Sequence, residues 1–306
     1  MAEVLCLGDS CADIIIPYGE SLSDPEASVT FNCGGAAANT ACALGKLGVD
    51  VAFAGKAGKD LYGISMKREL SQNNVNVSHF VLSDNQVSTQ ILIVIDENKD
   101  RHPFLMPKAN PSYLEVYPEE LNQIDLTGMK YILTNGMMLF DDPAAYAITS
   151  FLKKAHEKGV QILLDINYRP ETINKNSSNL KEIIHMADFL LGSAVDDYIA
   201  MTGINDLDEV AKILRNDHNV IVAHDEKGST VFDGRFKEHV NSFEVRVCDT
   251  IGAGDNFNAG FIYGLVNNKS LGECNRLGCA VAAFSLTRPG ARNTPDQKQL
   301  EMFLNK

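Results

Sequence analysis

The sequence lacks the cysteine spacing that a disulfide framework or a cysteine zinc site requires. Its 306 residues include seven cysteines, which is an odd number, and no two of them form a CxxC pair. We therefore expect most of these cysteines to be buried thiols that pack as small apolar side chains. A reducing, cytoplasmic compartment suits such a protein.

The sequence also lacks an excess of positive charge and a long apolar run. Its 27 basic and 40 acidic residues give a net charge of −13, which disfavours DNA or RNA as a partner. No basic segment precedes an apolar run at the N-terminus, and the longest uncharged stretch, residues 27–45, is too polar to span a bilayer. We expect neither a nucleic-acid nor a membrane partner.

The sequence contains short apolar runs that alternate with helical patterns. Continuous rather than alternating apolar runs are typical of strands that are buried on both faces of a parallel sheet. We therefore predict an α/β layered fold with a mostly parallel sheet. The strands are expected at residues 4–7, 13–16, 51–54, 89–95, 131–133, 161–164, 188–191, 220–223 and 229–232.

Two segments break this alternation, at about residues 13–31 and 87–106. Both have an extended pattern without a helix, so we expect them to form a small sheet over one end of the main body. The chain has no linker rich in Pro, Ser or Gly and no internal repeat. It is therefore predicted to be a single domain over residues 1–306 with an inserted lid.

The most informative segment is residues 248–261, Cys-Asp-Thr-Ile-Gly-Ala-Gly-Asp-Asn-Phe-Asn-Ala-Gly-Phe. A helix is predicted to begin near Ala253, and the glycines Gly252 and Gly254 would expose amide groups that bind an anion. Asp255 would lie beside that anion. This position favours a role for Asp255 as the base that takes a proton from an attacking nucleophile. The alternative is that Asp255 only stabilises the helix dipole.

A second glycine-containing segment, residues 32–41, reads Asn-Cys-Gly-Gly-Ala-Ala-Ala-Asn-Thr-Ala. Gly34 and Gly35 precede a helix of small residues that is predicted to run to about Leu47. The small side chains are also consistent with close helix packing alone, and Asn39 with a hydrogen-bonded amide in the core.

Together the two segments closely resemble the signatures of the ribokinase-like (PfkB) carbohydrate kinase family. The resemblance covers nearly the whole chain. It implies a ribokinase-like three-layer sandwich with a mostly parallel central sheet and a small β-sheet lid. It also implies ATP and Mg²⁺ as cofactors, with K⁺ as a further candidate, and a homodimer formed through the lid.

Carried over by this resemblance, Asp255 is the catalytic base and the amides of Gly252, Ala253 and Gly254 form the anion hole. Thr250 would lie near the nucleotide phosphates. The tail at residues 287–291 resembles the family's nucleotide and cation loop, so that Asp249 and Gly290 become candidates for a monovalent-cation site.

For the acceptor, the resemblance implies that Gly34, Gly35 and Asn39 contact sugar hydroxyls. Asp13 matches the aspartate that binds them in many members, although it is also consistent with a solvated turn carboxylate. Residues 165–170 resemble the corresponding stretch of fructokinases and 2-keto-3-deoxygluconate kinases. There Arg169 could bind a carboxylate or phosphate in a bidentate manner, or form an ion pair with Asp165 or another acid.

The chain departs from the family pattern in two places. Residues 194–197 read Ala-Val-Asp-Asp where the family has Asn-x-x-Glu, so Asp197 would replace the Glu, and the Asn is absent unless Ser193 replaces it after a local shift. Residues 223–228 read Ala-His-Asp-Glu-Lys-Gly where many members have Thr-x-Gly-x-x-Gly. Asp225, Lys227 and Gly228 are thus the candidates beside the nucleotide, and Asp225 would weaken its binding unless Mg²⁺ or Lys227 compensates.

The resulting expectation is an ATP-dependent kinase that phosphorylates a hydroxymethyl group of a sugar or sugar acid. A nucleoside acceptor is the alternative within the same family. The alternative that is not an enzyme is a binding or regulatory protein on the kinase scaffold. The departures at Asp225 and Ala194 motivate this alternative, whereas the intact Asp255 segment opposes it.

Overall fold

The computed structural model describes residues 2–21, 23–24, 26–97, 101–106, 111–139, 143–169, 177–216, 219–234 and 236–305. Within these residues the main body contains a nine-stranded sheet. In spatial order its strands are β13 (Lys237–Asn241), β12 (Gly228–Phe232), β11 (Val220–Asp225), β10 (Phe189–Ser193), β9 (Gln161–Asp165), β8 (Tyr131–Asn135), β1 (Val4–Leu7), β4 (Val51–Gly58) and β5 (Val75–Ser83).

The sheet is parallel from β11 to β5, and β12 and β13 add an antiparallel edge. All four residues of β1 and all eight of β4 are buried, which follows from their apolar or small side chains. The exception among these side chains is Lys56 of β4, whose ammonium is paired with Glu120 at 2.8 Å. The predicted strands of this sheet are present in the structure. The sequence patterns did not predict β5, in which polar residues interrupt the apolar ones, or β13, which is mostly exposed.

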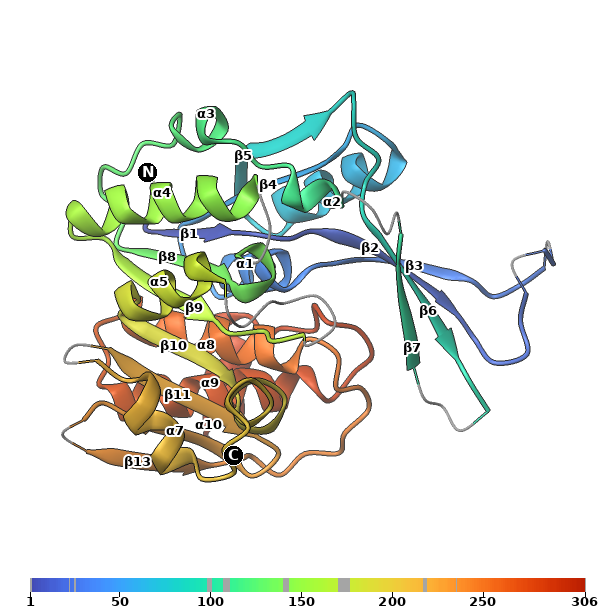
Figure 1. The fold of residues 1–306 in the computed structure, drawn as a ribbon. Coiled ribbons are helices and arrows are strands. Elements are labelled where there is room, and N and C mark those ends of the chain that lie inside the picture. Colours follow the sequence, from blue (N-terminus) through green and yellow to red (C-terminus); the bar gives the residue numbers. More distant parts are fainter. Residues whose placement is uncertain are drawn as a thin grey trace.

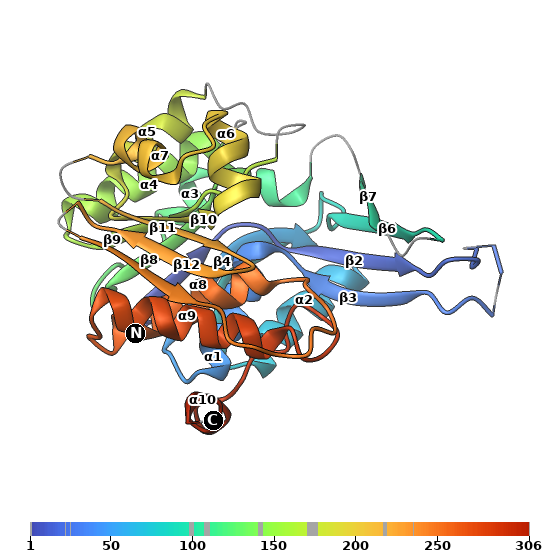
Figure 2. The same ribbon diagram turned by 90° about the horizontal axis from the view of Figure 1, so that it is seen from below.

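Helices cover both faces of the sheet, so the body has three layers (Figure 2). One face carries α1 (Ala36–Lys46), α2 (Leu61–Gln72), α8 (Ala253–Val266), α9 (Leu271–Ser285) and α10 (Gln297–Leu304). The other carries α3 (Pro118–Leu121), α4 (Ala144–Glu157), α5 (Ser178–Met186) and α7 (Leu207–Leu214). Each face of the sheet has its own apolar cluster, as expected for a sheet buried on both sides.

A second, four-stranded sheet projects from one end of the body (Figure 1). Its order is β3 (Thr30–Gly34), β2 (Cys11–Ile16), β6 (Gln90–Ile95) and β7 (Arg101–Met106). The segments 13–31 and 87–106 contribute to these strands, which confirms the expected small separate sheet. We call this sheet the lid.

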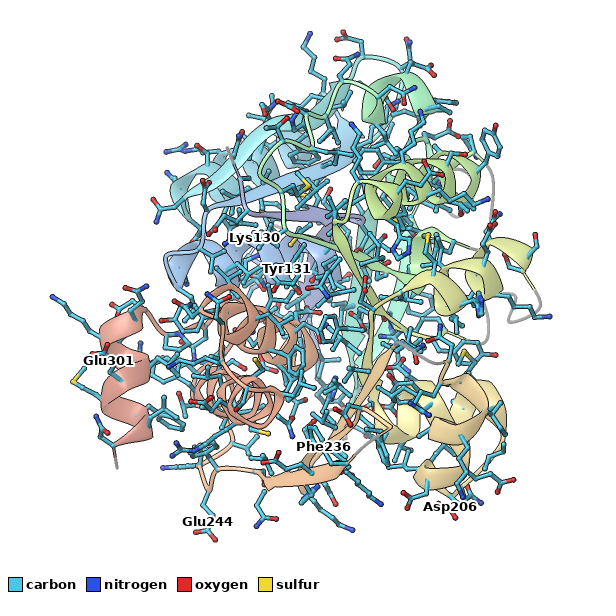
Figure 3. All side chains as sticks on the ribbon, turned by 90° about the vertical axis from the view of Figure 1, so that its left-hand side faces the viewer. Lys130, Tyr131, Asp206, Phe236, Glu244 and Glu301 are labelled. Carbon is cyan, nitrogen blue, oxygen red and sulfur yellow. The ribbon has the colours of Figure 1, made fainter. Side chains whose placement is uncertain are left out.

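Figure 3 shows the end of the body that lies opposite the lid. Lys130 and Tyr131, at the start of β8, lie in the middle of the face that points away from the lid. The Lys130 ammonium forms an ion pair with Glu3, 2.6 Å away, just before β1. The parallel strands therefore begin at this face and end toward the lid. In the described part of the chain, no helix combines the length and apolar character that crossing a membrane demands.

Candidate active site

A cavity of about 1040 Å³ lies where the parallel strands end. Four of its polar lining residues belong to these strand ends: Asp9 just after β1, Asp165 as the last residue of β9, Ser193 as the last of β10, and His224 near the end of β11. Ligands of open α/β sheets bind at this edge because the loops that follow the strands converge there. The cavity is therefore the candidate active site.

The turn before α8 forms one wall of the cavity. Gly252 has φ = 72° as the helix N-cap, and a Cβ atom there would lie 2.7 Å from the Ala291 Cβ, so glycine is required. At the start of the helix, the Asn256 amide donates an i→i−4 hydrogen bond to the Gly252 carbonyl at 2.9 Å. The amides of Gly254 and Asp255 thus lie in the first turn of the helix, where N–H groups have no intrahelical acceptor.

Gly252, Ala253, Gly254 and Thr250 all line the cavity. The turn is held by Asn256, whose side-chain amide donates to the carbonyls of Gly252 and Ala291 at 2.8 Å each. The amide groups are therefore fixed before any ligand binds, which is the arrangement that stabilises charge in a transition state at low reorganisation cost.

The carboxylate of Asp255 also lines the cavity. It accepts a hydrogen bond from the Asn39 side-chain amide at 2.8 Å, so α1 and α8 meet at this residue. Burial raises the pKa of Asp255 from 3.8 to about 7, and the negative charge of Asp9 contributes in the same direction. Asn39 and the cations Arg169 and Arg292 lower it. A carboxyl group with this pKa is suited to accept a proton near neutral pH.

Asp9 is a site residue that the sequence analysis missed. Its carboxylate accepts hydrogen bonds from the amides of Ala36 and Ala37, at 3.0 and 3.1 Å, and from the Asn135 side chain at 2.6 Å. It therefore caps α1, because the N-cap residue Gly35 has no side chain. Its position directly after a buried strand was the signal available in the sequence.

Asp13 lies on β2 opposite Asn32 of β3, at the base of the lid. Its carboxylate accepts a hydrogen bond from the Cys11 thiol at 3.4 Å and lies so close to Gly34 that a Cβ atom there would overlap it. Cys11 and Gly35 line the cavity, whereas Asp13 and Gly34 are not among its described lining residues. Of the predicted acceptor residues, Gly35 thus lines the cavity and Asn39 contacts Asp255, whereas Asp13 and Gly34 lie against each other at the base of the lid.

Arg169 lines the cavity, and its guanidinium donates to the Tyr168 carbonyl at 2.8 Å. Burial and the charges of Asp197 and Asp255 raise the pKa of Asp165 well above its usual range, while Arg169 lowers it. The guanidinium thus faces acids and the cavity at the same time. Both proposed roles of Arg169, binding an anionic acceptor and forming an ion pair, fit this position.

The segment after β10 forms a π-helix (Ala194–Ile199), in which hydrogen bonds join residues five apart rather than four. Asp197 lines the cavity, but its two oxygens accept the amides of Tyr168 and Ser193 at 2.6 Å each. Asp196 and Ser193 line the cavity as well, and Ser193 caps the helix by accepting the Asp196 amide at 3.1 Å. This geometry favours the shifted pairing of Ser193 with Asp196.

Three of the predicted nucleotide residues, Asp225, Lys227 and Gly228, lie on the β11–β12 hairpin. Asp225 and Gly228 line the cavity. The Asp225 carboxylate accepts a hydrogen bond from the Lys227 amide at 2.7 Å and thereby stabilises the turn. Lys227 is not among the described lining residues. His224 lies beneath the α8 turn, with its ring centroid 4.9 Å from that of Phe257, and burial lowers its pKa to about 4. It is therefore a neutral packing residue at the cavity wall.

Asp249 and Gly290, the two candidates for a monovalent-cation site, contact each other. The Asp249 carboxylate accepts the amides of Ile251 at 3.1 Å and Gly290 at 2.9 Å, which joins the loop before α8 to the tail loop. Among the residues that the structure describes, no group of three or more His, Cys, Asp or Glu side chains is arranged to hold a metal ion.

Comparison with known proteins identifies the family to which the chain belongs. The model of the pfkB family carbohydrate kinases matches residues 1–298. The chain belongs to this family. It is 25% identical to the 5-dehydro-2-deoxygluconokinase of Lacticaseibacillus casei, with 99% of this chain and 96% of the relative covered. The protein is thus a carbohydrate kinase, an enzyme that transfers phosphate to a sugar hydroxyl.

Solved structures of pfkB-type fold agree with the architecture. Fructokinase with bound ATP from Xylella fastidiosa superposes with a TM-score of 0.86 at 20% identity, covering 100% of this chain and 99% of that one. Aminoimidazole riboside kinase from Salmonella enterica, complexed with its riboside and an ATP analog, gives 0.83 at 22% identity, covering 98% and 99%. The three-layer body and the lid of this carbohydrate kinase are therefore those of the ribokinase-like fold.

Proposed function

We propose that the protein transfers the γ-phosphoryl group of ATP to a hydroxymethyl group of a sugar or sugar acid, with Asp255 as general base. The observation that carries this proposal is the position of Asp255. Its carboxylate, with a pKa near neutrality, lies in the cavity beside the exposed amides of the α8 turn. A carboxylate beside an anion site opposes simple anion binding but suits proton removal from an attacking alcohol.

In the proposed step, the acceptor hydroxyl gives its proton to the Asp255 carboxylate. The oxygen then forms a bond to the γ-phosphorus, while the bond from that phosphorus to the β–γ bridging oxygen breaks and ADP leaves with the electron pair. The amides of the Gly252–Gly254 turn stabilise the charge on the migrating phosphoryl group. Product release leaves the proton on Asp255, from which it passes to solvent.

The donor would lie along the hairpin and the α8 turn, near Thr250, Asp225 and Gly228. Mg²⁺ usually takes one or two carboxylates together with phosphate oxygens and water. Asp196 and Ser193 offer oxygen donors at the cavity wall and fit that requirement. When bound there, Mg²⁺ would neutralise phosphate charge. The Asp249–Gly290 contact is the proposed place of a monovalent cation such as K⁺.

The acceptor would lie among Asp13, Gly34, Gly35 and Asn39, with Arg169 facing it. A sugar acid is supported by the relatives named 5-dehydro-2-deoxygluconokinase and by the cationic side chain of Arg169 in the cavity. A nucleoside is the second candidate, which the similarity to aminoimidazole riboside kinase supports. A buried set of carboxylate and amide groups would reject ligands without matching hydroxyls.

We further propose that the lid covers the acceptor and pairs with the lid of a second copy. Phe31, Phe104 and Met106 on its strands are 40%, 54% and 47% exposed, an apolar surface that a second copy would cover. Sedimentation velocity tests this proposal. Phe104→Glu should shift a dimer toward monomer, whereas Tyr146→Glu on α4, also an exposed aromatic, should not.

The decisive experiment incubates the protein with MgATP and a panel of neutral sugars, sugar acids and nucleosides, and detects products by mass spectrometry. We expect a phosphorylated sugar or sugar acid. Asp255→Asn should abolish turnover and preserve nucleotide binding, whereas Asp206→Asn, a conservative change at the distant α7 N-cap, should retain activity. Near wild-type turnover by Asp255→Asn would refute the mechanism. Absence of any product or nucleotide-induced thermal shift would favour a binding or regulatory protein.

A further inference from the structure

Arg292, on the tail loop after α9, is largely buried next to the proposed base. Its guanidinium donates from Nε to the Asn39 Oδ1 at 2.9 Å and from Nη2 to the Gly34 carbonyl at 3.4 Å. Nη1 lies 3.0 Å from the Glu69 carboxylate on α2, and the Arg292 side chain is only 9% exposed. Arg292 lies just beyond the tail segment 287–291, and no motif in the sequence pointed to it.

These contacts fix the orientation of the Asn39 side chain. A guanidinium can only donate hydrogen bonds, so the Asn39 oxygen must face Arg292 and its NH₂ group must face away from it. That NH₂ group donates to Asp255 Oδ2 at 2.8 Å. A reversed amide would place two donors together and an oxygen against a carboxylate, which is unfavourable in a buried site.

We propose that Arg292 is a positioning residue for the catalytic base: it locks the Asn39 amide, which in turn orients the Asp255 carboxylate toward the acceptor. The inference rests on the proposed function of this site. It adds a residue that touches neither reactant, because Arg292 reaches Asp255 through Asn39.

The charges around both residues give the direction of the expected effect. Asp9 raises the pKa of Asp255, while Asn39, Arg169 and Arg292 lower it. Loss of Arg292 would remove one cation and release the amide donor. The pKa of Asp255 should therefore rise further above its already elevated value of about 7.

The groups that face Arg292 itself do not compete for this role. Burial raises the pKa of Cys42 and raises that of Cys33 to about 12, so both thiols remain neutral near pH 7. Glu69 is the anion beside the guanidinium, and it is partly exposed. Lys46 donates to the backbone carbonyl of Arg292 at 2.7 Å and does not contact Asn39 by any described hydrogen bond.

Lys46 therefore provides a matched control. Arg292→Met removes a buried cation, and Lys46→Met removes a half-buried cation that contacts the same loop. Only Arg292→Met releases the Asn39 side chain. We expect Arg292→Met to lower kcat on the order of tenfold and to move the acidic limb of kcat/KM upward by about one pH unit. Lys46→Met should leave the pH profile unchanged. Arg292→Lys should recover part of kcat, because one ammonium can still reach Asn39.

A measurement without turnover separates this inference from the proposed function. Carboxyl ¹³C NMR, with Asp255→Asn to assign the resonance, gives the pKa of Asp255 in the wild-type and variant proteins, and melting temperatures confirm that the variants fold. A higher pKa in Arg292→Met than in Lys46→Met supports the positioning role, even for a chain that phosphorylates no tested acceptor. Equal pKa values and equal pH profiles would overturn it, whether or not the wild type is a kinase.

Discussion

Asn39 on α1 donates a hydrogen bond to the carboxylate of Asp255 on α8, across 2.8 Å and 216 positions of sequence. A second bond, from the Thr40 hydroxyl to the Asp255 carbonyl at 3.2 Å, fixes the backbone of the same residue. The two glycine-containing segments are thus parts of one site, because α1 and α8 lie side by side on one face of the sheet (Figure 2).

The pH dependence of turnover should report the ionisation of Asp255. Its pKa is raised to about 7, mainly by burial, and only the ionised form can accept the acceptor's proton. We expect kcat/KM to rise with pH through a single ionisation near 7 and to lose about tenfold per unit below it. A steady-state pH profile in constant-ionic-strength buffers checks this. An acidic limb near pH 4 would mean that the base is not desolvated as described.

The same ionisation should reduce the stability of the protein. Folded Asp255 holds its proton up to about pH 7, whereas unfolded Asp255 releases it near 3.8, so folding stability falls as pH rises through this window. Asp255→Asn removes the buried charge and keeps an oxygen that can accept from Asn39. It should be more stable than the wild type by about 2–4 kcal/mol at pH 8, with little difference at pH 4. Urea unfolding at both pH values tests the sign.

The sequence predicted much of this site because its two signatures carry physical constraints in local residues. Gly252 must be glycine for its backbone angle and its approach to Ala291, and Asp255 must follow within one turn. The predictions failed where position depends on tertiary contacts. Asp9 and Arg292 lie in short or irregular segments without periodicity, and only the packing of β1, α1 and the tail loop brings them to Asp255.

In the π-helix after β10, the adjacent residues Asp196 and Asp197 should have different roles. Asp197 is buried and accepts two backbone amides, whereas Asp196 is exposed to the cavity. Asp197→Asn would turn a donor toward one of those amides and should lower the free energy of unfolding by about 1–3 kcal/mol. Asp196→Asn should leave stability unchanged and raise the Mg²⁺ concentration needed for half-maximal activity. Equal Mg²⁺ dependence in both variants would place the ion elsewhere.

Asp225 should weaken donor binding through its charge rather than through its shape. Asp225→Asn keeps the oxygen that accepts the Lys227 amide at 2.7 Å and removes only the negative charge. Because the side chain is exposed, its charge should have only the modest effect of a surface charge pair. We therefore expect a two- to fivefold decrease in the KM for MgATP, on the order of that effect. Asp225→Gly, which also loses the turn contact, is the comparison. A KM that rises in Asp225→Asn would show that the carboxylate assists the nucleotide or its metal ion.

Substitution of Arg169 should show whether the acceptor is a sugar acid or a neutral sugar. Its removal will affect every acceptor, because its charge also lowers the pKa of Asp165 and Asp255. The informative quantity is therefore the ratio of kcat/KM for a sugar acid to that for a neutral ketose, from which the common effect cancels. If the guanidinium binds the acceptor carboxylate, Arg169→Gln should reduce this ratio by about ten- to a hundredfold, as expected for a charge-assisted hydrogen bond. An unchanged ratio would instead assign Arg169 to an ion pair with Asp165, and the acceptor's charge would have to be recognised by other groups.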